Sequence, residues 1–197
     1  MARISYVDPD SINDPELRSY LDASLEHGTP RLESQAIRAH VPELLRTFNQ
    51  TWQATFRDGV LDHSVKELAR VFIAKTLECG YCAGQRSHQA DLSEREFDEV
   101  IEFRKSTVLS DREKAALLLA EAIAWDPTMA DDAVWQQLHE HFTEPEIVEL
   151  GYFIGLTMGQ QKFLKTLDIK HGDLDRSSTT GLTEEAAEHV RAARSTS

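Results

Sequence analysis

The chain has 197 residues, of which 41% are hydrophobic, and this suits one domain of ordinary size with an additional terminal element. Its net charge of −13 argues against binding nucleic acid or an anionic membrane surface, because both need clustered lysine and arginine. No apolar run of signal-peptide length occurs at the start, and no later stretch approaches about 18 uninterrupted apolar residues. We therefore expect a cytoplasmic protein.

The apolar residues follow a helical spacing almost throughout. An aspartate cap with proline and an early acid opens a first helix over residues 14–28. A second helix starts within His40 to Leu45 and ends at Asp58-Gly59, with apolar residues three or four apart. A third covers His63 to about Leu77 and is apolar on most faces, so we expect it to be a central helix.

More helices follow in the second half of the chain. Residues 83–90 are expected to be helical, directly after a pair of cysteines. Two serines, each followed three residues later by glutamate, form capping boxes that predict helices starting at Ser93 and Ser110. Residues 131–142 and 143–169 supply two more. No alternating β-branched runs bounded by turns occur, so the predicted fold class is all-α, a helical bundle.

The composition changes near the C-terminal end. Residues 171–183 are rich in Asp, Ser, Thr and Gly and are interpreted as a linker, followed by a short helix or frayed tail to Ser197. We therefore predict three parts: an N-terminal helical extension (1–35), a helical domain (36–170), and a linker with a C-terminal tail (171–197).

Glycines recur every four residues on the last long helix, at Gly151, Gly155 and Gly159. In a membrane this spacing is typical of a dimer seam, but the surrounding helix carries too many polar residues. We interpret the glycines as close packing against another helix of the same subunit. A subunit interface is the alternative.

The two cysteines of the chain, Cys79 and Cys82, form a C-x-x-C pair, and Glu67 lies twelve residues before the first of them. Two thiols at this spacing can close a small disulfide ring, and a nearby carboxylate can accept a thiol proton. In the cytoplasm such a pair is more often catalytic or metal-binding than structural. A thioredoxin-type fold needs strands beside the pair, and the sequence offers none. We therefore predict dithiol redox chemistry, with Glu67 as the base.

Arg86 is a further candidate for the site. If the chain from about residue 80 onward is helical, at 100° per residue, Arg86 lies on the same side as both cysteines. A cation beside a thiol favours the reactive thiolate, although arginine cannot shuttle protons because it stays protonated. His88 points about 180° away from Cys79 and is a weaker candidate.

Other interpretations of the cysteines remain open. They could be two buried small apolar residues, or half of a zinc site that His63 or His88 completes. Structural zinc usually has four ligands in clear pairs, and no second C-x-x-C exists here. The chain has no motif for haem, flavin or nucleotide, so we expect no cofactor.

A glutamate, eleven intervening residues and C-x-x-C on consecutive helices resemble the carboxymuconolactone decarboxylase superfamily, and within it the alkylhydroperoxidase D-like proteins. Residues 40–45 and 109–116 support this resemblance, which covers roughly residues 38 to 125. It implies a helical bundle that forms homo-oligomers, often trimers or hexamers. The decarboxylase branch uses no cysteine pair, so the pair points away from that reaction.

The resemblance also implies roles for the site residues. Cys82 would attack a hydroperoxide, and Cys79 would resolve the resulting sulfenic acid as a disulfide. Glu67 would take the proton. An external dithiol, such as a lipoyl-bearing or thioredoxin-like protein, would recycle the disulfide.

The chain departs from the family pattern at two positions. Active members usually carry histidine four residues after the second cysteine and often another between the cysteines, where this chain has Arg86 and Tyr81. The glutamate–histidine relay is therefore missing, and His88 replaces it only if the backbone after Cys82 is not regular helix. Two alternatives follow: a non-catalytic redox sensor or oligomeric scaffold, and a cysteine-independent decarboxylase or lyase that acts on a small acidic metabolite.

Overall fold

The computed structural model describes residues 2–195 and separates the chain into two compact units. Unit 1 comprises Met1–Trp52, Gly84–His88 and Phe163–Ser197, and unit 2 comprises Gln53–Ala83 and Gln89–Lys162. Within residues 2–195 the regular structure is helical and no β-strand forms, apart from one isolated bridge. The predicted all-α fold is confirmed. The predicted domain boundaries near residues 35 and 170 differ from the boundaries of these two compact units. The predicted division into domains stays a prediction.

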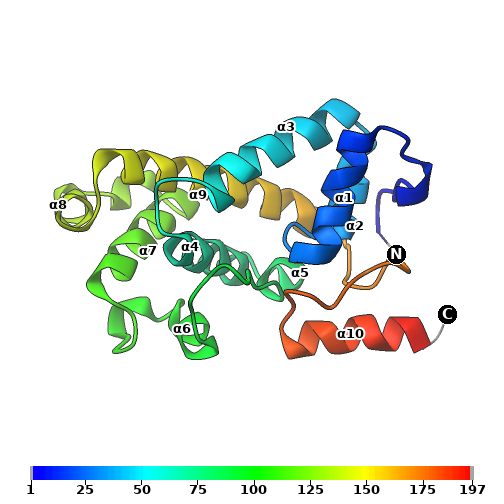
Figure 1. The fold of residues 1–197 in the computed structure, drawn as a ribbon. Coiled ribbons are helices and arrows are strands. Elements are labelled where there is room, and N and C mark those ends of the chain that lie inside the picture. Colours follow the sequence, from blue (N-terminus) through cyan, green and yellow to red (C-terminus); the bar gives the residue numbers. More distant parts are fainter. Residues whose placement is uncertain (1, 196–197) are drawn as a thin grey trace. The chain divides into compact units, whose positions relative to one another are not determined.

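Unit 2 is built around one buried helix. α4 packs against α7 and α6, and α7 also packs against α8 (Figure 1). The core between them contains aliphatic and aromatic side chains from each of these helices, among them Leu68, Phe72, Leu117 and Leu138. The elements of this unit are η2 (Gln53–Arg57, a π-helical turn), α4 (His63–Thr76), α5 (Gly80–Ala83), α6 (Glu94–Glu99), η3 (Phe103–Lys105), α7 (Asp111–Ala124), η4 (Pro127–Met129), α8 (Asp132–His141) and α9 (Glu144–Thr166) up to Lys162.

The local sequence explains where these helices begin. The Asp62 carboxylate accepts the backbone N–H of Ser64 at 2.8 Å and so caps α4. The capping boxes at Ser93 and Ser110 are both present and start α6 and α7, as predicted. The prediction of α4 as a central helix is also confirmed, because every residue from Val65 to Ala74 is buried.

The predicted helix over residues 83–90 is wrong, because α5 stops at Ala83. The next residues pair with a distant segment of unit 1 instead of continuing the helix. The N–H of Thr183 donates to the Gly84 carbonyl at 2.8 Å, and the N–H of Arg86 donates to the Gly181 carbonyl at 2.7 Å. These long-range bonds replace the hydrogen bonds that a further helical turn would make.

Unit 1 has a small apolar core formed by Leu17, Leu21, Leu32 and Leu45. Its first long helix runs as predicted: the Asp14 carboxylate caps its start, and Gly28 ends it in the left-handed conformation. The sequence analysis predicted no helix at α2. The elements of unit 1 are η1 (Pro9–Ser11), α1 (Pro15–His27), α2 (Leu32–Arg38), α3 (Pro42–Trp52), the last turn of α9, and α10 (Glu184–Ser195).

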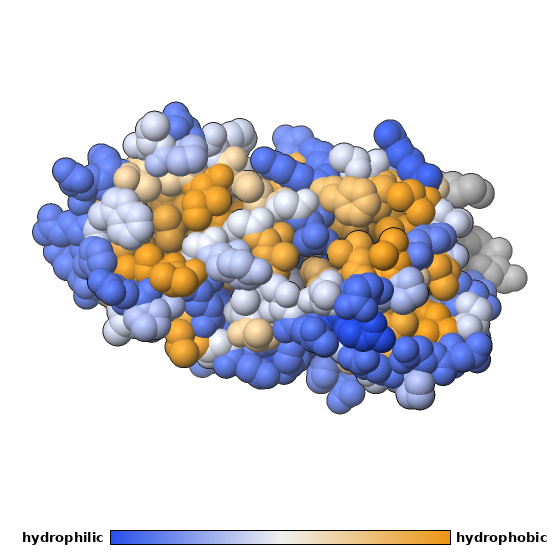
Figure 2. Space-filling model, turned by 90° about the horizontal axis from the view of Figure 1, so that it is seen from above, coloured by the Kyte–Doolittle hydropathy of each residue, from blue (hydrophilic) through white to orange (hydrophobic). Residues whose placement is uncertain are grey.

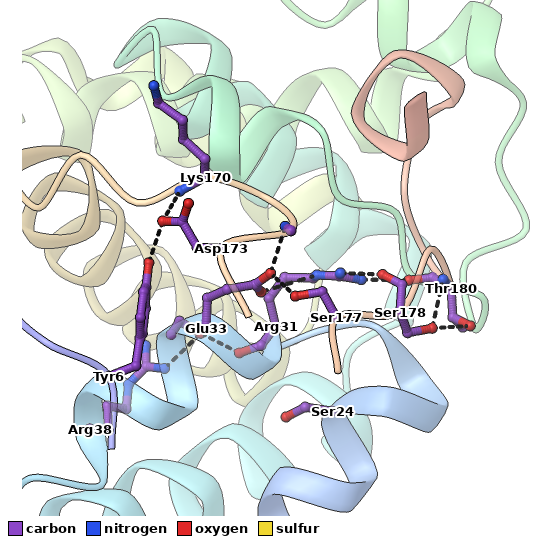
Figure 3. Close-up of polar contacts among 12 residues, drawn as sticks. Tyr6, Ser24, Arg31, Glu33, Arg38, Lys170, Asp173, Ser177, Ser178 and Thr180 are labelled. Carbon is purple, nitrogen blue, oxygen red and sulfur yellow. Dashed lines mark hydrogen bonds and ion pairs between the residues drawn. The ribbon is translucent and has the colours of Figure 1, made fainter. Parts of the chain in front are cut away.

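A buried polar network at the start of α2 binds a segment of the same unit that is distant in the sequence (Figure 3). Arg31 is buried, and its guanidinium donates to the carbonyls of Ser178 and, at 2.9 Å, Thr180. Glu33 is also buried and accepts from the Ser177 hydroxyl and, at 3.0 Å, from the backbone N–H of Gly172. The stretch interpreted as a linker is therefore fixed to α2 at four backbone or side-chain positions.

The predicted tail after this stretch forms α10, which ends at Ser195, and its last two predicted residues lie outside the described part of the chain. Tyr6 adds a further contact to the same stretch, since its hydroxyl donates to the Asp173 carboxylate at 2.6 Å (Figure 3). Burial and this hydrogen bond raise the pKa of Tyr6 above its ordinary value.

The surface shown in Figure 2 mixes hydrophobic and hydrophilic residues. Among residues 2–195, no helix has both the length and the apolar composition needed to span a bilayer. The glycines of α9 lie open: among residues 2–195, apart from the adjoining backbone of α9 itself, a Cβ built on Gly151, Gly155 or Gly159 meets no atom within 4 Å. The predicted close packing of these glycines within the subunit is therefore wrong. The subunit interface stays a prediction.

Candidate functional site

The two cysteines lie in a tight turn that follows α4. Glu78 adopts a φ of 51°, which is uncommon for a residue with a side chain, just after α4 has ended. The Cys79 N–H donates back to the Ala74 carbonyl at 2.9 Å, and the Cys79 carbonyl accepts the N–H of Ala83 at 2.8 Å. The single turn of α5 is closed in this way, next to the end of α4 (Figure 1).

This turn brings the thiols of Cys79 and Cys82 together. Their Sγ atoms lie 2.6 Å apart, and the two side chains are thiols that no disulfide joins. Both residues are buried, with 2% and 3% of their surface exposed. A thiol that loses its proton here is removed from bulk water, so the neighbouring charges decide how readily it ionises.

Glu67 lies inside α4 with no exposed surface, and Arg70 holds it. The Nε of Arg70 donates to one carboxylate oxygen at 2.6 Å, and a terminal nitrogen donates to the other at 2.7 Å. This two-pronged contact fixes the plane of the carboxylate as well as its position. Glu67 is therefore paired with a fixed cation on its own helix.

Arg70 also contacts the cysteine turn. Its other terminal nitrogen donates to the Cys82 carbonyl at 2.9 Å. The backbone of Arg70 is held in turn by Gln161 of α9, whose amide donates to the Arg70 carbonyl at 3.1 Å. One guanidinium thus connects the predicted base to the backbone of the predicted nucleophile.

Arg70 is not among the site residues that the sequence predicts. The available signal was its spacing of three residues from Glu67 on a predicted helix, which places the two side chains on one face. Burial lowers the pKa of Arg70, but attraction to Glu67, the hydrogen bonds to it and the two cysteines raise the pKa overall. The guanidinium therefore stays protonated.

Arg86 and His88 do not lie on a continuation of the cysteine helix. Arg86 belongs to unit 1, where one of its terminal nitrogens donates to the Gln85 carbonyl at 2.9 Å. His88 lies in an exposed turn of the same unit. The angles derived from a helix beyond residue 83 are wrong for both residues, because that helix does not form. Tyr81 is buried within α5.

His63, which was considered as a zinc ligand, starts α4. Its Nδ1 lies 2.7 Å from the Phe56 carbonyl, which fixes Nδ1 as the protonated nitrogen. Burial lowers the pKa of His63, against the opposing effect of the hydrogen bond to Phe56 and of the Glu67 charge. Among residues 2–195, no three or more His, Cys, Asp or Glu side chains gather in a way that could hold a metal ion.

A second buried ion pair lies beside the first on α4. Lys66 is 1% exposed and donates to Glu149 of α9 at 2.8 Å. The same carboxylate accepts the N–H groups of Val60 at 2.5 Å and Leu61 at 3.3 Å. This pair fixes the turn that leads into α4.

Residues 42–122 match the model of the Carboxymuconolactone decarboxylase family. A curated relative, the uncharacterized protein YnjA of Escherichia coli, is 31% identical over 112 residues. The match covers 55% of this chain and 62% of YnjA, so the chain spans less than two thirds of that relative.

Two solved structures match nearly the whole chain. A peroxidase-related protein of Ralstonia eutropha, described as an alkylhydroperoxidase AhpD core, has a TM-score of 0.70 and 17% identity and covers 98% of this chain and 96% of its own. The debrominase Bmp8 has a TM-score of 0.72 and 16% identity and covers 98% and 97%. At these identities both matches describe the fold alone.

Proposed function

Because residues 42–122 match the carboxymuconolactone decarboxylase family and the chain has the fold of its alkylhydroperoxidase D-like members, we propose that the protein is a dithiol oxidoreductase that reduces hydroperoxides. The observation that carries this proposal is the distance of 2.6 Å between the Sγ atoms of Cys79 and Cys82. This distance supports the formation of a disulfide between the two thiols, and Glu67 lies buried on the preceding helix.

In the proposed cycle the Cys82 thiolate attacks the terminal oxygen of the hydroperoxide. The O–O bond breaks, Cys82 becomes a sulfenic acid, and the alkoxide leaves as the alcohol after it takes a proton. Cys79 then attacks the sulfenic sulfur, water leaves and a disulfide forms. Two thiols are oxidised and one hydroperoxide is reduced to alcohol and water.

An external dithiol completes the cycle by reducing the disulfide through a mixed disulfide. We propose that a lipoyl-bearing or thioredoxin-like protein supplies it, in the cytoplasm, where thiols are kept reduced. We also propose that the protein acts as a homo-oligomer, with trimers and hexamers as the first states to examine.

The test is a peroxide-consumption assay with a panel of dithiols, including dihydrolipoamide and a reduced thioredoxin. Wild type is expected to turn over repeatedly, whereas Cys82→Ser is expected to be inactive. Cys79→Ser is expected to accumulate a sulfenic acid that a dimedone probe labels once per chain. Undiminished consumption in both variants would refute the cysteine mechanism.

The same assay separates the alternatives. A redox sensor or scaffold oxidises once per chain and then stops, whatever the dithiol. A cysteine-independent lyase acting on a small acidic metabolite keeps its activity in the Cys79→Ser/Cys82→Ser double variant.

The likeness to a debrominase over nearly the whole chain adds a second substrate class to the assay. A related structure is that of a cysteine-to-alanine variant of Bmp8 in complex with 2,3,4-tribromopyrrole. A brominated pyrrole can replace the hydroperoxide as electron acceptor, because the dithiol supplies two electrons and bromide leaves as hydrogen takes its place. Bromide release without peroxide consumption would move the proposal to that substrate class.

A further inference from the structure

The buried charges around the cysteine turn limit how a thiol can ionise. Glu67 and Arg70 carry one negative and one positive charge, and both are almost entirely withdrawn from solvent. If a thiol loses its proton to water, the buried site holds two negative charges against one positive. If the proton passes to Glu67 instead, one negative charge remains, on sulfur, and Arg70 balances it.

We propose that Arg70 is a positioning residue for the reaction proposed above: it holds Glu67 and the Cys82 turn in one fixed arrangement and provides the positive charge that the thiolate needs once its proton has passed to Glu67. The inference rests on the proposed dithiol function. It assigns the proton transfer to Glu67 and the balancing positive charge to Arg70.

The contacts of the guanidinium carry this proposal. Two of its nitrogens bind Glu67, at 2.6 and 2.7 Å, and the third binds the Cys82 carbonyl at 2.9 Å. When Glu67 becomes protonated, it loses its charge but can stay in place against the same nitrogens. The guanidinium therefore keeps its geometry while the negative charge moves from oxygen to sulfur.

Two other titratable side chains on α4 bind partners outside the cysteine turn. Lys66 is paired with Glu149, and His63 is held on the Phe56 carbonyl with its pKa lowered by burial. Tyr81, which is buried, and Glu78, which is exposed, are the other titratable side chains of the cysteine turn. The attraction of Arg70 to both cysteines, which raises the pKa of Arg70, is the same interaction that favours a thiolate.

The step balances in protons and electrons. Glu67 takes the proton of the Cys82 thiol, and the thiolate displaces alkoxide from the hydroperoxide. Glu67 then returns the proton to the alkoxide, so that alcohol leaves and the carboxylate pairs again with Arg70. Cys79 closes the disulfide with loss of water, and the external dithiol restores both thiols.

The experiment is a pH titration of thiolate ultraviolet absorbance in a Cys79→Ser background, where Cys82 is the single thiol. The spectrum of the Cys79→Ser/Cys82→Ser variant is subtracted to remove the contribution of tyrosine. The key variant is Arg70→Gln/Glu67→Gln, which removes both charges and preserves approximate shape. We expect its apparent Cys82 pKa to lie about one unit or more above that of Glu67→Gln, which keeps the Arg70 charge beside the thiol.

Glu67→Gln alone leaves the guanidinium without its carboxylate, so the apparent pKa of Cys82 is expected to fall below that of the parent. The matched control is Lys66→Gln/Glu149→Gln, which neutralises the neighbouring buried pair on the same helix. It is expected to leave the thiol titration unchanged. Equal titrations in Glu67→Gln and in Arg70→Gln/Glu67→Gln would overturn the role of Arg70.

If Arg70→Gln/Glu67→Gln does not fold, Arg70→Lys tests the role of Arg70 instead. It keeps the charge but loses the fork that orients Glu67, so the thiol pKa should stay near that of the parent while kcat falls about tenfold or more. An unchanged kcat would overturn the positioning role. Because the titration needs no peroxide, an Arg70-dependent pKa in a protein without turnover would refute the proposed function and leave the charge coupling intact.

Discussion

Arg70 donates to both carboxylate oxygens of Glu67, at 2.6 and 2.7 Å, within a single turn of α4. Both side chains are buried, where an unpaired charge is costly. Each charge is therefore stabilised by the other. The pair is a structural element of the central helix as well as a part of the site.

Removing one member of this pair should therefore destabilise the protein more than removing both. Glu67→Gln or Arg70→Gln leaves an uncompensated buried charge, which typically costs about 3–5 kcal/mol. The double variant leaves none and is expected to lose less than either single variant. Urea unfolding of the reduced proteins measures this difference, and additive losses would contradict the coupling.

Glu149 should be more important to stability than an ordinary helix acid. Its carboxylate accepts from Lys66 and from the N–H groups of Val60 and Leu61, so Glu149→Gln weakens all three contacts and leaves Lys66 buried without an anion. We expect a loss of about 3–5 kcal/mol in the free energy of unfolding. Glu144→Gln, at the exposed start of the same helix, is the control and should change stability little.

Gly28 and Gly155 are expected to respond to alanine in opposite directions. Gly28 has a φ of 71°, and an added Cβ would lie 2.1 Å from the Thr180 carbonyl oxygen, so Gly28→Ala must displace backbone. The left-handed conformation alone costs an alanine about 1–2 kcal/mol. Gly155 is helical and open, so Gly155→Ala should stabilise the fold by about 0.5–1 kcal/mol.

Thermal unfolding of both variants checks this pair of expectations. A destabilising Gly155→Ala, accompanied by a smaller assembly in size-exclusion chromatography, would show instead that another subunit covers this face of α9.

Stability should fall on acidification partly because of His63. Its pKa is lowered in the folded protein, so the unfolded chain binds the proton more readily. The contribution of neutral His63 is complete above the unfolded pKa of about 6.5 and is lost as pH falls below that value towards the folded pKa. In urea titrations from pH 8 to 5, His63→Gln should flatten this part of the stability profile. An unchanged slope would show that other groups cause it.

Much of unit 2 follows from short-range patterns. The apolar content of the stretch from His63 predicts a buried helix, and the capping boxes at Ser93 and Ser110 place two helix starts correctly. The C-x-x-C pair and Glu67 are visible in the sequence because their spacing is local. What they do remains a proposal.

The features that the sequence did not reveal depend on distant partners. α2 has no apolar periodicity, since buried polar residues such as Glu33 and Gln35 fill it and gain partners from elsewhere in unit 1. The end of α5 is set by hydrogen bonds to Gly181 and Thr183, which lie about a hundred residues away in the sequence. Arg70 resembles an ordinary surface residue until its burial is known.

The anchoring of the C-terminal stretch on α2 also determines when unit 1 can be completed during synthesis. Arg31 and Glu33 gain these partners only after residues that lie 147 and 144 positions further along the chain have been synthesised. Unit 2 needs no residue beyond Lys162, so its helices can pack while the ribosome is still adding the last segment of unit 1. The N-terminal helices, although made first, are therefore expected to become resistant to protease last.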